Sequence, residues 1–501
     1  MHYHPSISSR RRFLRQSAVL VGGAVLLPPS LAYSAAQPLR PAVPVRIRGR
    51  VQTGGRGLAG VAVTDGLSIV ETANDGAFAL VSNTRRPFVY LSMPAGFAMP
   101  QNETGTARFY RPIEAGPGGE MQVLFDLERR GGDDENHAFL VLCDPQTQDD
   151  RDMGLFHQET VPDVQQTLQS LGNTPAFGVS CGDIMWDRLS LYPEYERAVS
   201  RMGIPFFQVV GNHDLDFDGP TDQTSVRTFQ RHFGPAHYSF DRGAVHYVVL
   251  DDVFWNANNY FGYLDADQLA WLEADLARVE AGRTVVVFAH IPAHSTRMFR
   301  VDGSSPPPNI SITNRAAFYR LLEPFQAHLI TGHTHESEHV FEGGIHEHVQ
   351  GTACGAWWTG PICADGTPAG YGVYEVRGDE LRWRYKATGH AADHQLRLYA
   401  RGADPAAPNE IVANVWDWDP EWTVVWFEDG VRKGPMARRI GTDPMSERLH
   451  RGGAVPEPRP WVEPVPSGHL FYAPVSPDTR EIRVEATDRF GRAYSEVLSA
   501  R

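Results

Sequence analysis

The sequence predicts an α/β domain between two β-rich regions. Residues 137–350 alternate fully apolar runs with segments of helical spacing. Continuous apolar strands are typical of a sheet that is buried on both faces, so helices are expected to cover it. Residues 45–130 and 351–501 instead show short β-type runs separated by turns. We therefore expect an N-terminal β-sandwich, a central α/β domain and a C-terminal, mainly β domain, with those boundaries.

The expected elements follow from periodicity and turn residues. Apolar residues at helical spacing after Asp265, a plausible N-cap, predict a helix over 265–279. The polar segment Arg377 to Glu380 predicts a hairpin turn, and the composition of 433–466 predicts a long irregular loop. The other expected helices are 161–171 and 192–202; the expected strands are 45–51, 60–66, 77–80, 88–94, 138–143, 176–181, 205–210, 245–250, 284–289, 327–331, 371–376, 381–385, 410–416, 423–428 and 481–486.

Composition is that of an ordinary globular protein of more than one domain. The chain has 501 residues, 42% of them hydrophobic, and a formal net charge of −14. An acidic balance argues against nucleic acid as the main partner. Cys143 and Cys181 are expected to be buried thiols, whereas Cys354 and Cys363 flank a loop and could pair.

The first 36 residues resemble a twin-arginine export signal. Three consecutive arginines at 10–12 precede an apolar run over 18–27, and small residues follow. A membrane anchor is the alternative, but the run is far shorter than the about 20 residues that span a bilayer. No other segment approaches transmembrane length. We therefore expect a periplasmic or secreted protein.

Polar motifs follow the apolar strands at their carboxyl ends. Such ends meet on one rim of a parallel sheet, which brings residues distant in sequence together. Carboxylate, amide and imidazole donors suit Mn²⁺, Fe or Zn²⁺, and no Cys belongs to the set. Two adjacent divalent metals can clamp a phosphate and generate hydroxide near neutral pH. The sequence therefore predicts a cage for two metals made by Asp144, Asp183, Asn212, His290, His333 and His335.

Within this cage the residues predict different tasks. Asp183 is expected to bridge both metals, because a central carboxylate can hold two cations about 3.5–4 Å apart. His213 stands beside Asn212 and suits a general acid that protonates the leaving oxygen. Either Asp187 or Asp214 could hold the charged form of His213.

The order of the motifs resembles the calcineurin-like metallophosphoesterase superfamily. The flanks, for example 354–360 and 413–416, are similar to an exported bacterial subgroup that carries additional N- and C-terminal β domains. The resemblance implies a four-layer αββα core and hydrolysis of a phosphoric ester by a metal-bound hydroxide. The motifs that carry it are Asp144-Pro145-Gln146, Gly182-Asp183, Gly211-Asn212-His213-Asp214, His290 and Gly332-His333-Thr334-His335.

The resemblance also implies a division of the ligands between two sites. Gln146 stands where most of the superfamily has His, and an amide oxygen is a weaker donor than imidazole. The first site is therefore expected to bind its metal less tightly, to prefer a harder ion or to coordinate more water. The first site would use Asp144, Asp183 and His335, with Gln146 beside them, and the second would use Asp183, Asn212, His290 and His333.

Histidines and aromatic residues outside the cage leave alternatives open. Tyr260 is a candidate for substrate contact or for core packing. His294, four residues after His290, is a candidate for the pocket or for the surface. His346 and His348 share one face of an expected strand and are expected to lie outside the cage.

Together these features predict a periplasmic phosphoesterase with two divalent metals that hydrolyses the monoester of a small phosphorylated substrate. A phosphodiesterase acting on nucleotides, glycerophosphodiesters or lipid head groups is the alternative enzyme. A non-catalytic protein that binds glycans or the cell envelope is the alternative of another class. The intact Asp183, Asn212, His213 and His333 argue against that last alternative.

Overall fold

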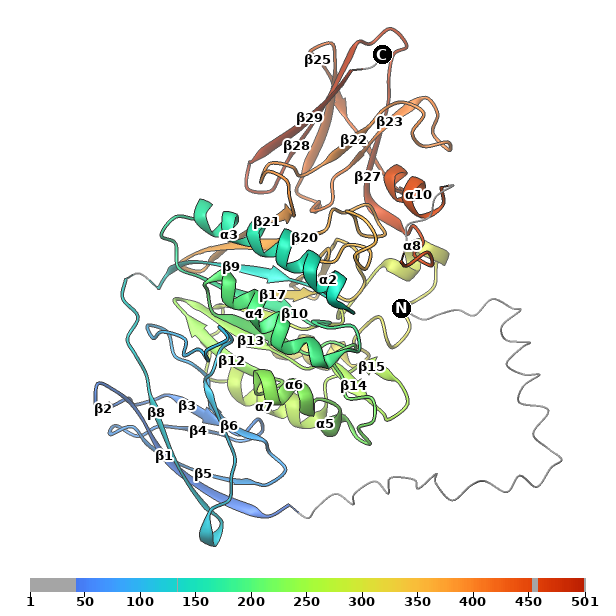
Figure 1. Ribbon diagram of the computed structural model, residues 1–501. Helices are drawn as coiled ribbons and strands as arrows, with labels where there is room; N and C mark the ends of the chain where they lie inside the picture. Colours follow the sequence, from blue (N-terminus) through green and yellow to red (C-terminus); the bar gives the residue numbers. More distant parts are fainter. Residues whose placement is uncertain (1–41, 133, 453–457, 500–501) are drawn as a thin grey trace, which may run out of the picture. The chain divides into compact units, whose positions relative to one another are not determined.

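Two sheets form the centre of the structure, a computed structural model that describes residues 42–132, 134–452 and 458–499 (Figure 1). Strands β9, β10 and β11 are parallel, as are β13, β16, β17 and β19, so their carboxyl ends reach common edges. The first sheet has the order β11 (Phe206–Val209), β10 (Ala176–Cys181), β9 (Asn136–Leu142), β20 (Gly370–Arg377) and β21 (Glu380–Ala387). The second has the order β12 (Tyr238–Arg242), β13 (Val245–Val249), β16 (Thr284–Phe288), β17 (Gln326–Thr331), β19 (Ile345–Val349) and β18 (Glu338–Glu342).

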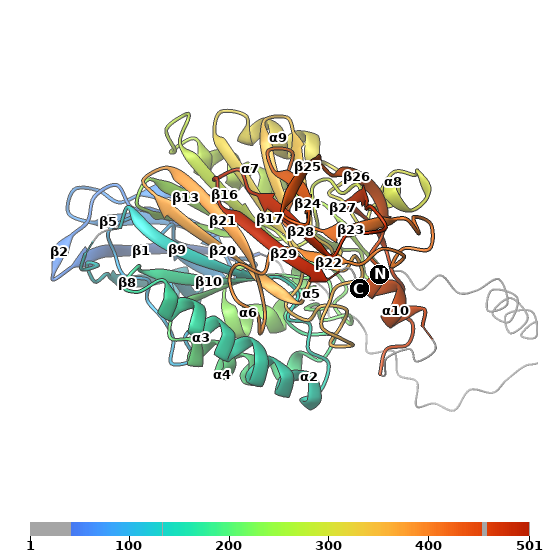
Figure 2. The same cartoon turned by 90° about the horizontal axis from the view of Figure 1, so that it is seen from above.

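Alternation along these buried strands produces four layers. In β9, Phe139 faces the other sheet and meets Phe288 of β16 at 5.7 Å between ring centroids, whereas Leu140 joins the cluster formed with helices. In β16, Val287 faces away from the sheet interface and packs in the cluster of Trp271. Figure 2 shows α2, α3 and α4 on one side of the sheets and α7 and α9 on the other. The predicted αββα core is therefore confirmed.

The helices cover the sheets much as predicted. Helix α7 begins after Asp265, whose carboxylate accepts a hydrogen bond from the N–H of Gln268 at 2.7 Å, so the predicted N-cap is confirmed. A π-helical turn, Phe156–Thr160, joins α2 to α3. The helices are α2 (Asp150–Leu155), α3 (Val161–Ser170), α4 (Tyr192–Met202), α5 (Asp222–Ser225), α6 (Arg227–Phe233), α7 (Ala266–Leu276), α8 (Arg297–Asp302), α9 (Arg315–Leu322) and α10 (Pro444–His450).

The N-terminal region consists of two four-stranded sheets. Strand β1 lies between β5 and β8, and its buried Ile47 joins Val63 of the other sheet in one hydrophobic cluster. The two sheets therefore pack face to face, as a β-sandwich does. Their strands are β1 (Pro44–Thr53), β2 (Arg56–Gly57), β5 (Ala77–Asn83) and β8 (Glu120–Asp126), then β3 (Ala62–Thr64), β4 (Ile69–Glu71), β6 (Phe88–Leu91) and β7 (Tyr110–Pro112).

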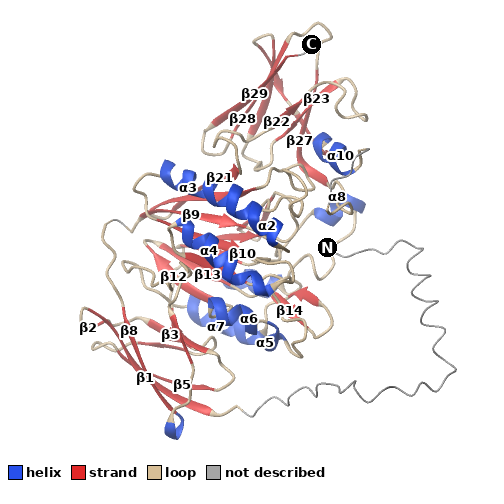
Figure 3. Cartoon of the chain, viewed as in Figure 1, coloured by secondary structure: helices blue, strands red, loops and turns tan. Residues whose placement is uncertain are grey.

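The C-terminal region contains a second β-sandwich. Figure 3 shows strands as its main elements, whereas most helices gather around the central sheets. Buried residues of both sheets, such as Ala413 and Val484, share one cluster. Its sheets have the orders β22 (Arg397–Tyr399), β23 (Glu410–Asn414), β27 (Pro466–Pro474), β26 (Ala437–Thr442) and β25 (Val431–Pro435), β24 (Thr423–Glu428), β28 (Glu481–Thr487), β29 (Ala493–Ser499).

One expectation for the C-terminal part is wrong, and one strand pairing was not predicted. The hairpin β20–β21 lies within the range 351–501, and β20 pairs with β9 and thereby extends the first central sheet. The predicted irregular loop over 433–466 contains β26 and α10. Strand β26 is an exposed edge rich in Arg, so it lacks the apolar alternation that marks a strand. Helix α10 has an Asp443 N-cap followed by Pro444, which is a signal the sequence did offer.

The predicted export signal, residues 1–36, lies outside the described residues. A search of the described helices finds none with the length and apolar character needed to cross a bilayer.

Candidate metal centre

The predicted ligands meet where the parallel strands end. Asp144 follows β9, Asp183 follows β10, Asn212 follows β11 and His290 follows β16. His333 and His335 lie on one loop after β17. All six side chains are buried, with at most 7% of any residue exposed. The structure therefore brings this predicted set together at one edge of the two sheets.

Three donor atoms surround a fourth, Nε2 of His290. This nitrogen lies 3.2 Å from Oδ1 of Asn212, 3.3 Å from Oδ1 of Asp183 and 3.2 Å from Nδ1 of His333. One N–H cannot donate to three acceptors at once, whereas one cation accepts electron pairs from all four atoms. Such spacing is also close to the about 3.3 Å that separates two ligands on a tetrahedral ion with bonds of about 2.0–2.1 Å.

Main-chain carbonyls determine which ring nitrogen of each histidine is free. Nδ1 of His290 donates to the carbonyl of Cys181 at 3.2 Å, and Nε2 of His333 donates to that of Asn309 at 2.7 Å. Nδ1 of His335 donates to the carbonyl of Gly355 at 2.9 Å. The opposite nitrogen of each ring therefore presents a lone pair, which is how proteins orient histidines that bind metals.

Asp183 connects this group of donors to a second one. Its Oδ1 faces His290, while its Oδ2 lies 3.2 Å from Nε2 of Gln146. Oδ1 of Asp144 lies 3.4 Å from Nε2 of His335. Oε1 of Gln146 is buried and has no hydrogen-bond partner among the described residues. The two oxygens of Asp183 are thus divided between two sets of donors, as expected of a bridging ligand.

The chemistry of the donors fits two divalent cations. Burial opposes charge on the His290 ring, but Asp183 outweighs it and raises the pKa of His290 to about 10. The same pairing outweighs burial in the opposite direction and lowers the pKa of Asp183. The protein therefore stabilises positive charge where the donors converge. Buried carboxylates that demand a compensating cation, together with an oxygen left unpaired on Gln146, fit Mn, Fe or Zn.

Backbone strain concentrates in the same loops. Left-handed φ values are uncommon outside glycine and cost energy, so they cluster where function requires them. Among the described non-glycine residues with positive φ, eight of ten belong to this centre or to the loop packed on it. These eight are Asp144, Gln146, Asp183, Asp187, His333, His335, Trp357 and Trp358.

Two glycines permit the close approach of the ligand loops. A Cβ on Gly182, which has φ +77°, would lie 2.1 Å from Nδ1 of His290. A Cβ on Gly211 would lie 1.9 Å from the main-chain nitrogen of Asp183. Any side chain at either position would force the ligands apart, which explains glycine before Asp183 and before Asn212.

Beside the donors, His213 is paired with Asp187. Nδ1 of His213 lies 2.6 Å from Oδ1 of Asp187, and 23% of the His213 side chain is exposed. Burial lowers the pKa of His213, but Asp183 and Asp187 outweigh it, so the net shift is upward. Asp214, the other candidate partner, instead accepts the N–H groups of Ile184 and Met185.

Three buried acids that the sequence analysis did not single out as loop anchors hold the ligand loops. Asp214 accepts the N–H of Gly211 as well as those of the Asp183 loop. Asp252 accepts the N–H groups of His290 and Ile291 at 3.0 and 2.9 Å. Glu347 accepts those of Ala293 and His294. Asp252 comes shortly after the end of β13, and this position at a strand end offered a signal for a functional residue. The main-chain N–H groups that it accepts could not be predicted from the sequence.

Aromatic side chains flank the donors. Tyr260 lies 6.1 Å from His333 between ring centroids, as expected for a residue near the site. Trp357 stacks on His335 at 4.1 Å, and Trp186 lies 5.7 Å from His213. Trp461, from the C-terminal region, contacts both tryptophans and is 39% exposed. Trp186 and Trp461 were not predicted, because no local pattern distinguishes them from core residues.

His294 has a partner of its own. Its Nδ1 lies 2.7 Å from Oε2 of Glu342 on β18, and its main-chain N–H donates to Glu347. The side chain is about one-third exposed. A role of His294 in substrate binding stays a prediction, without a contact to support it.

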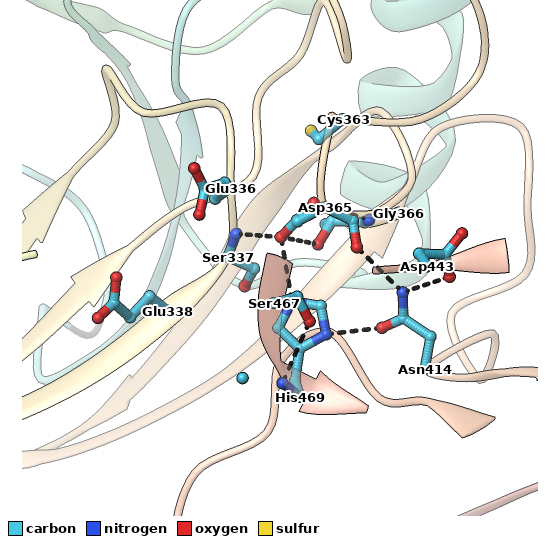
Figure 4. A network of polar contacts seen from close by, with 12 residues as sticks. Glu336, Ser337, Glu338, Cys363, Asp365, Gly366, Asn414, Asp443, Ser467 and His469 are labelled. Atoms are coloured by element: carbon cyan, nitrogen blue, oxygen red, sulfur yellow. Dashed lines mark hydrogen bonds and ion pairs between the residues drawn. The ribbon is translucent and has the colours of Figure 1, made fainter. Parts of the chain in front are cut away.

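A polar network ties the His335 loop to the C-terminal sandwich. Figure 4 shows Asp365 between Ser337 and His469. The N–H of Ser337 donates to Oδ2 of Asp365 at 2.8 Å, and Nε2 of His469 lies 3.0 Å from the same oxygen. Nδ1 of His469 reaches Asn414 at 2.6 Å, and Asn414 donates to Asp443. The C-terminal region therefore helps to fix the loop that carries two donors.

All four cysteines are buried and free. The prediction of free thiols at Cys143 and Cys181 is confirmed. Cys354 and Cys363 do not pair; both sulfurs lie near Oγ1 of Thr352, at 3.7 and 3.6 Å. None of the four sulfurs belongs to the donor set.

Comparison with known protein families matches three parts of the chain. A family model described as Calcineurin-like phosphoesterase matches residues 139–337. Models described as the N terminal and the C terminal of Calcineurin-like phosphoesterase match residues 45–130 and 347–494.

Individual proteins match over shorter stretches. The human serine/threonine-protein phosphatase CPPED1 is 33% identical over 138 residues, which cover 25% of this chain and 43% of that protein. Purple acid phosphatase 22 of Arabidopsis thaliana is 30% identical over 105 residues, 18% of this chain and 23% of that protein. The chain thus spans less than half the length of the curated relatives it matches.

Two solved structures are also similar. A dimetal phosphatase from Danio rerio has 16% identity and a TM-score of 0.35, covering 50% of this chain and 96% of that one. Purple acid phosphatase PPD1 from yellow lupin has 12% identity and a TM-score of 0.35, covering 69% of this chain and 67% of that one.

Proposed function

The chain belongs to the calcineurin-like phosphoesterases, a family of metal-dependent phosphoester hydrolases, and we propose that it hydrolyses phosphomonoesters at a two-metal centre. The observation that carries this proposal is the convergence of Nε2 of His290 with donor atoms of Asn212, Asp183 and His333. The other oxygen of Asp183 faces Gln146, in a second group of donors. Asp144, Gln146, Asp183 and His335 would hold one cation. Asp183, Asn212, His290 and His333 would hold the other.

Two divalent cations would neutralise a phosphate and lower the pKa of water near it. His213 is the residue we assign to the leaving group. Asp187 engages its Nδ1, so the proton available for transfer is the one on Nε2. Because the His213 side chain is partly exposed beside Asp183, it would be placed to protonate the leaving oxygen of an ester held at the centre as the P–O bond breaks.

The aromatic side chains suit the organic part of the substrate. Tyr260 and the tryptophans Trp186, Trp357 and Trp461 flank the donors. Flat apolar faces next to a charged centre favour an ester whose alcohol is at least partly apolar or aromatic. We propose that these aromatic side chains, and not a cluster of cations, determine which ester the protein prefers.

Export completes the proposal. The arginine-rich segment and apolar run within residues 1–36 support passage through the twin-arginine pathway into the periplasm or beyond. A fusion of these residues to a reporter that must fold before export would test this. Retention of the fusion in the cytoplasm, with or without the paired arginines, would contradict it.

Elemental analysis together with two model esters tests the enzymatic proposal. We expect about two metal equivalents at the centre and faster turnover of p-nitrophenyl phosphate than of bis(p-nitrophenyl) phosphate. Faster turnover of the bis ester would favour the phosphodiesterase alternative. Protein that binds no divalent metal and cleaves neither ester would contradict the proposal and favour a binding protein.

A further inference from the structure

A second group of histidines lies within the strands themselves. His346 and His348 are two residues apart on β19 and therefore share one face. The register places His328 of β17 beside His346, and His339 of β18 opposite His348. We call these four residues the strand histidine cluster. They share no hydrogen bond with the donors of the metal centre among the described residues.

Ring nitrogens of the cluster approach one another closely. Nδ1 of His328 lies 3.1 Å from Nε2 of His348, and Nδ1 of His339 lies 2.9 Å from Nε2 of His346. One nitrogen from each of His328, His346 and His348 lies within 4.8 Å of the other two. Nitrogens that share a tetrahedral Zn²⁺ are about 3.3 Å apart. To share one ion, these nitrogens would have to approach one another by up to about 1.5 Å.

Burial leaves the cluster short of hydrogen-bond partners. His348 is fully buried, and its Nδ1 has no partner among the described residues. His346 is 7% exposed. Burial lowers the pKa of His328 to about 4. Burial also lowers the pKa of His346 and His348, so these three rings are neutral near pH 7, which is the state in which imidazole binds metals. The two contacts between rings and the one between His339 and Asp417 leave Nδ1 of His348 without a partner, and an unsatisfied buried nitrogen is costly.

The surroundings suit a cation. Nε2 of His339 lies 3.0 Å from Oδ1 of Asp417, whose other oxygen accepts the N–H of Tyr385 at 3.1 Å. A carboxylate on the outer nitrogen leaves a lone pair on Nδ1 and is a common second partner of a metal-bound histidine. Arg489 is the nearby positive charge, and it is compensated by Asp419 at 2.7 Å and Glu421 at 3.3 Å.

A tryptophan closes the cluster on the side of the other central sheet. Trp383 of β21 lies between 4.6 and 6.1 Å from all four rings, measured between centroids. Its carbonyl accepts a hydrogen bond from Arg492, a residue of the C-terminal region. The cluster therefore lies where β17, β18 and β19 meet β21 and residues contributed by the C-terminal region.

We propose that His328, His346 and His348 bind one Zn²⁺ ion, with His339 as an adjacent fourth donor. Mg²⁺ and Ca²⁺ prefer oxygen ligands, whereas a donor set of neutral imidazoles without carboxylates suits Zn²⁺. Because the site is buried and enclosed by Trp383, this ion would stabilise the structure and would not meet substrate. It fastens the second central sheet to Asp417 through His339.

Anomalous diffraction at the zinc edge on wild-type crystals grown with Zn²⁺ tests the site directly. We expect a peak within bonding distance of nitrogens from His328, His346 and His348. Peaks at the Asp183 centre without one at the cluster would overturn the proposal. This experiment requires no variant, so its result does not depend on whether a substitution disturbs folding.

A solution experiment separates the two sites. His328→Gln changes a half-buried ring at the rim of the cluster. His390→Gln makes the same substitution at an exposed histidine outside the cluster and serves as the control. We expect His328→Gln to lose one zinc equivalent and part of the rise in melting temperature that added Zn²⁺ gives the wild type. His390→Gln should retain both.

The third variant, Asp183→Asn, keeps this inference distinct from the proposed function. It should lose metal at the catalytic centre yet retain the equivalent bound by the cluster. Unchanged zinc content and an unchanged response to Zn²⁺ in folded His328→Gln would show that the rings only hydrogen bond to one another, and the proposal would be wrong.

Discussion

The two groups of histidines in this protein differ in how their ring nitrogens are used. At the metal centre, main-chain carbonyls engage one nitrogen of His290, His333 and His335. The other nitrogen of His290 and of His335 faces carboxylate or amide oxygens, and that of His333 faces Nε2 of His290. In the strand histidine cluster, the nitrogens face one another. The first arrangement mixes negative and neutral donors, whereas the second is wholly neutral.

Backbone conformation separates the two groups in the same way. Asp144, Asp183, His333 and His335 have left-handed φ values, whereas no histidine of the strand cluster is among the described residues with positive φ. Strained loops allow donors to converge from five strand ends. In regular strands, only side chains that the strand register places side by side can meet. The comparison indicates a reactive centre in the loops and a structural site in the strands.

Asp183→Asn is expected to have the largest effect. Loss of an outer partner of a metal ligand typically costs about 10–100-fold, so loss of the bridging charge should reduce kcat/KM by on the order of a thousandfold or more. Asp302→Asn, at an exposed carboxylate, is the matched control. Hydrolysis assays and metal analysis measure the outcome. Near wild-type turnover by Asp183→Asn would refute the bridging assignment.

His213→Gln tests the residue beside the donors. Loss of a general acid should lower kcat by about 10²–10⁴-fold for an alkyl phosphate, and by less for p-nitrophenyl phosphate, whose leaving group needs no proton. Metal content should not change. Asp187→Asn should have the same dependence on leaving group with a smaller loss. If both esters slow equally, His213 does not protonate the leaving oxygen.

Most of the central fold follows from local patterns in the chain. Continuous apolar runs such as 138–143 and 284–289 became the parallel strands, and their polar ends became the donor loops. Alternation within those runs also explains the four layers. Strand β26 was missed because it is an exposed edge whose arginines carry no alternation. The pairing of the β20–β21 hairpin with β9 was not predicted, because the sequence of the hairpin itself does not encode its partner strand.

The donor residues of the site could be predicted from the sequence, whereas the groups that orient and surround them could be predicted less well. Asp183, Asn212 and His290 stand in recognisable positions at strand ends. The carbonyls that orient the rings, such as that of Asn309, come from loops without periodicity. The contact between Trp461 and Trp186 joins residues 275 positions apart, and no local rule connects them. The strand cluster required the register of three strands, which a single sequence does not determine.

His246 shows what a histidine without a free nitrogen looks like. Its Nδ1 lies 3.0 Å from Asp241 and its Nε2 lies 3.0 Å from Asp275. Burial lowers its pKa, but the two carboxylates outweigh burial and raise the pKa of His246 to about 9. Arg283, which pairs with Asp241, is the nearby positive charge.

Because that pKa is raised on folding, the stabilisation is complete below about pH 6.5 and is lost as pH rises through 9. Wild-type protein should lose on the order of 3 kcal/mol of unfolding free energy over this interval relative to His246→Gln. Urea unfolding at several pH values measures the difference. Parallel curves for the two proteins would contradict the assignment and would weaken the distinction between satisfied and ligand histidines.

Gln146→His is expected to have the smallest effect, and it makes the first site more like the strand cluster. Gln146 has φ +38°, and histidine tolerates positive φ better than most residues, so the loop can accept it. An imidazole nitrogen in place of the unpaired amide oxygen should tighten metal binding by about tenfold, or ~1.4 kcal/mol.

Competition with a chelator measures that affinity, and Gln148→His is a control two residues away. Gln148 lies in the same loop, and its main-chain N–H and side chain engage Asp152 and Arg459 instead of the donors. We expect tighter binding of one metal equivalent only in Gln146→His. Unchanged stoichiometry and affinity would mean that the side chain at position 146 does not bind metal, and that Asp144, Asp183 and His335 form the first site without it.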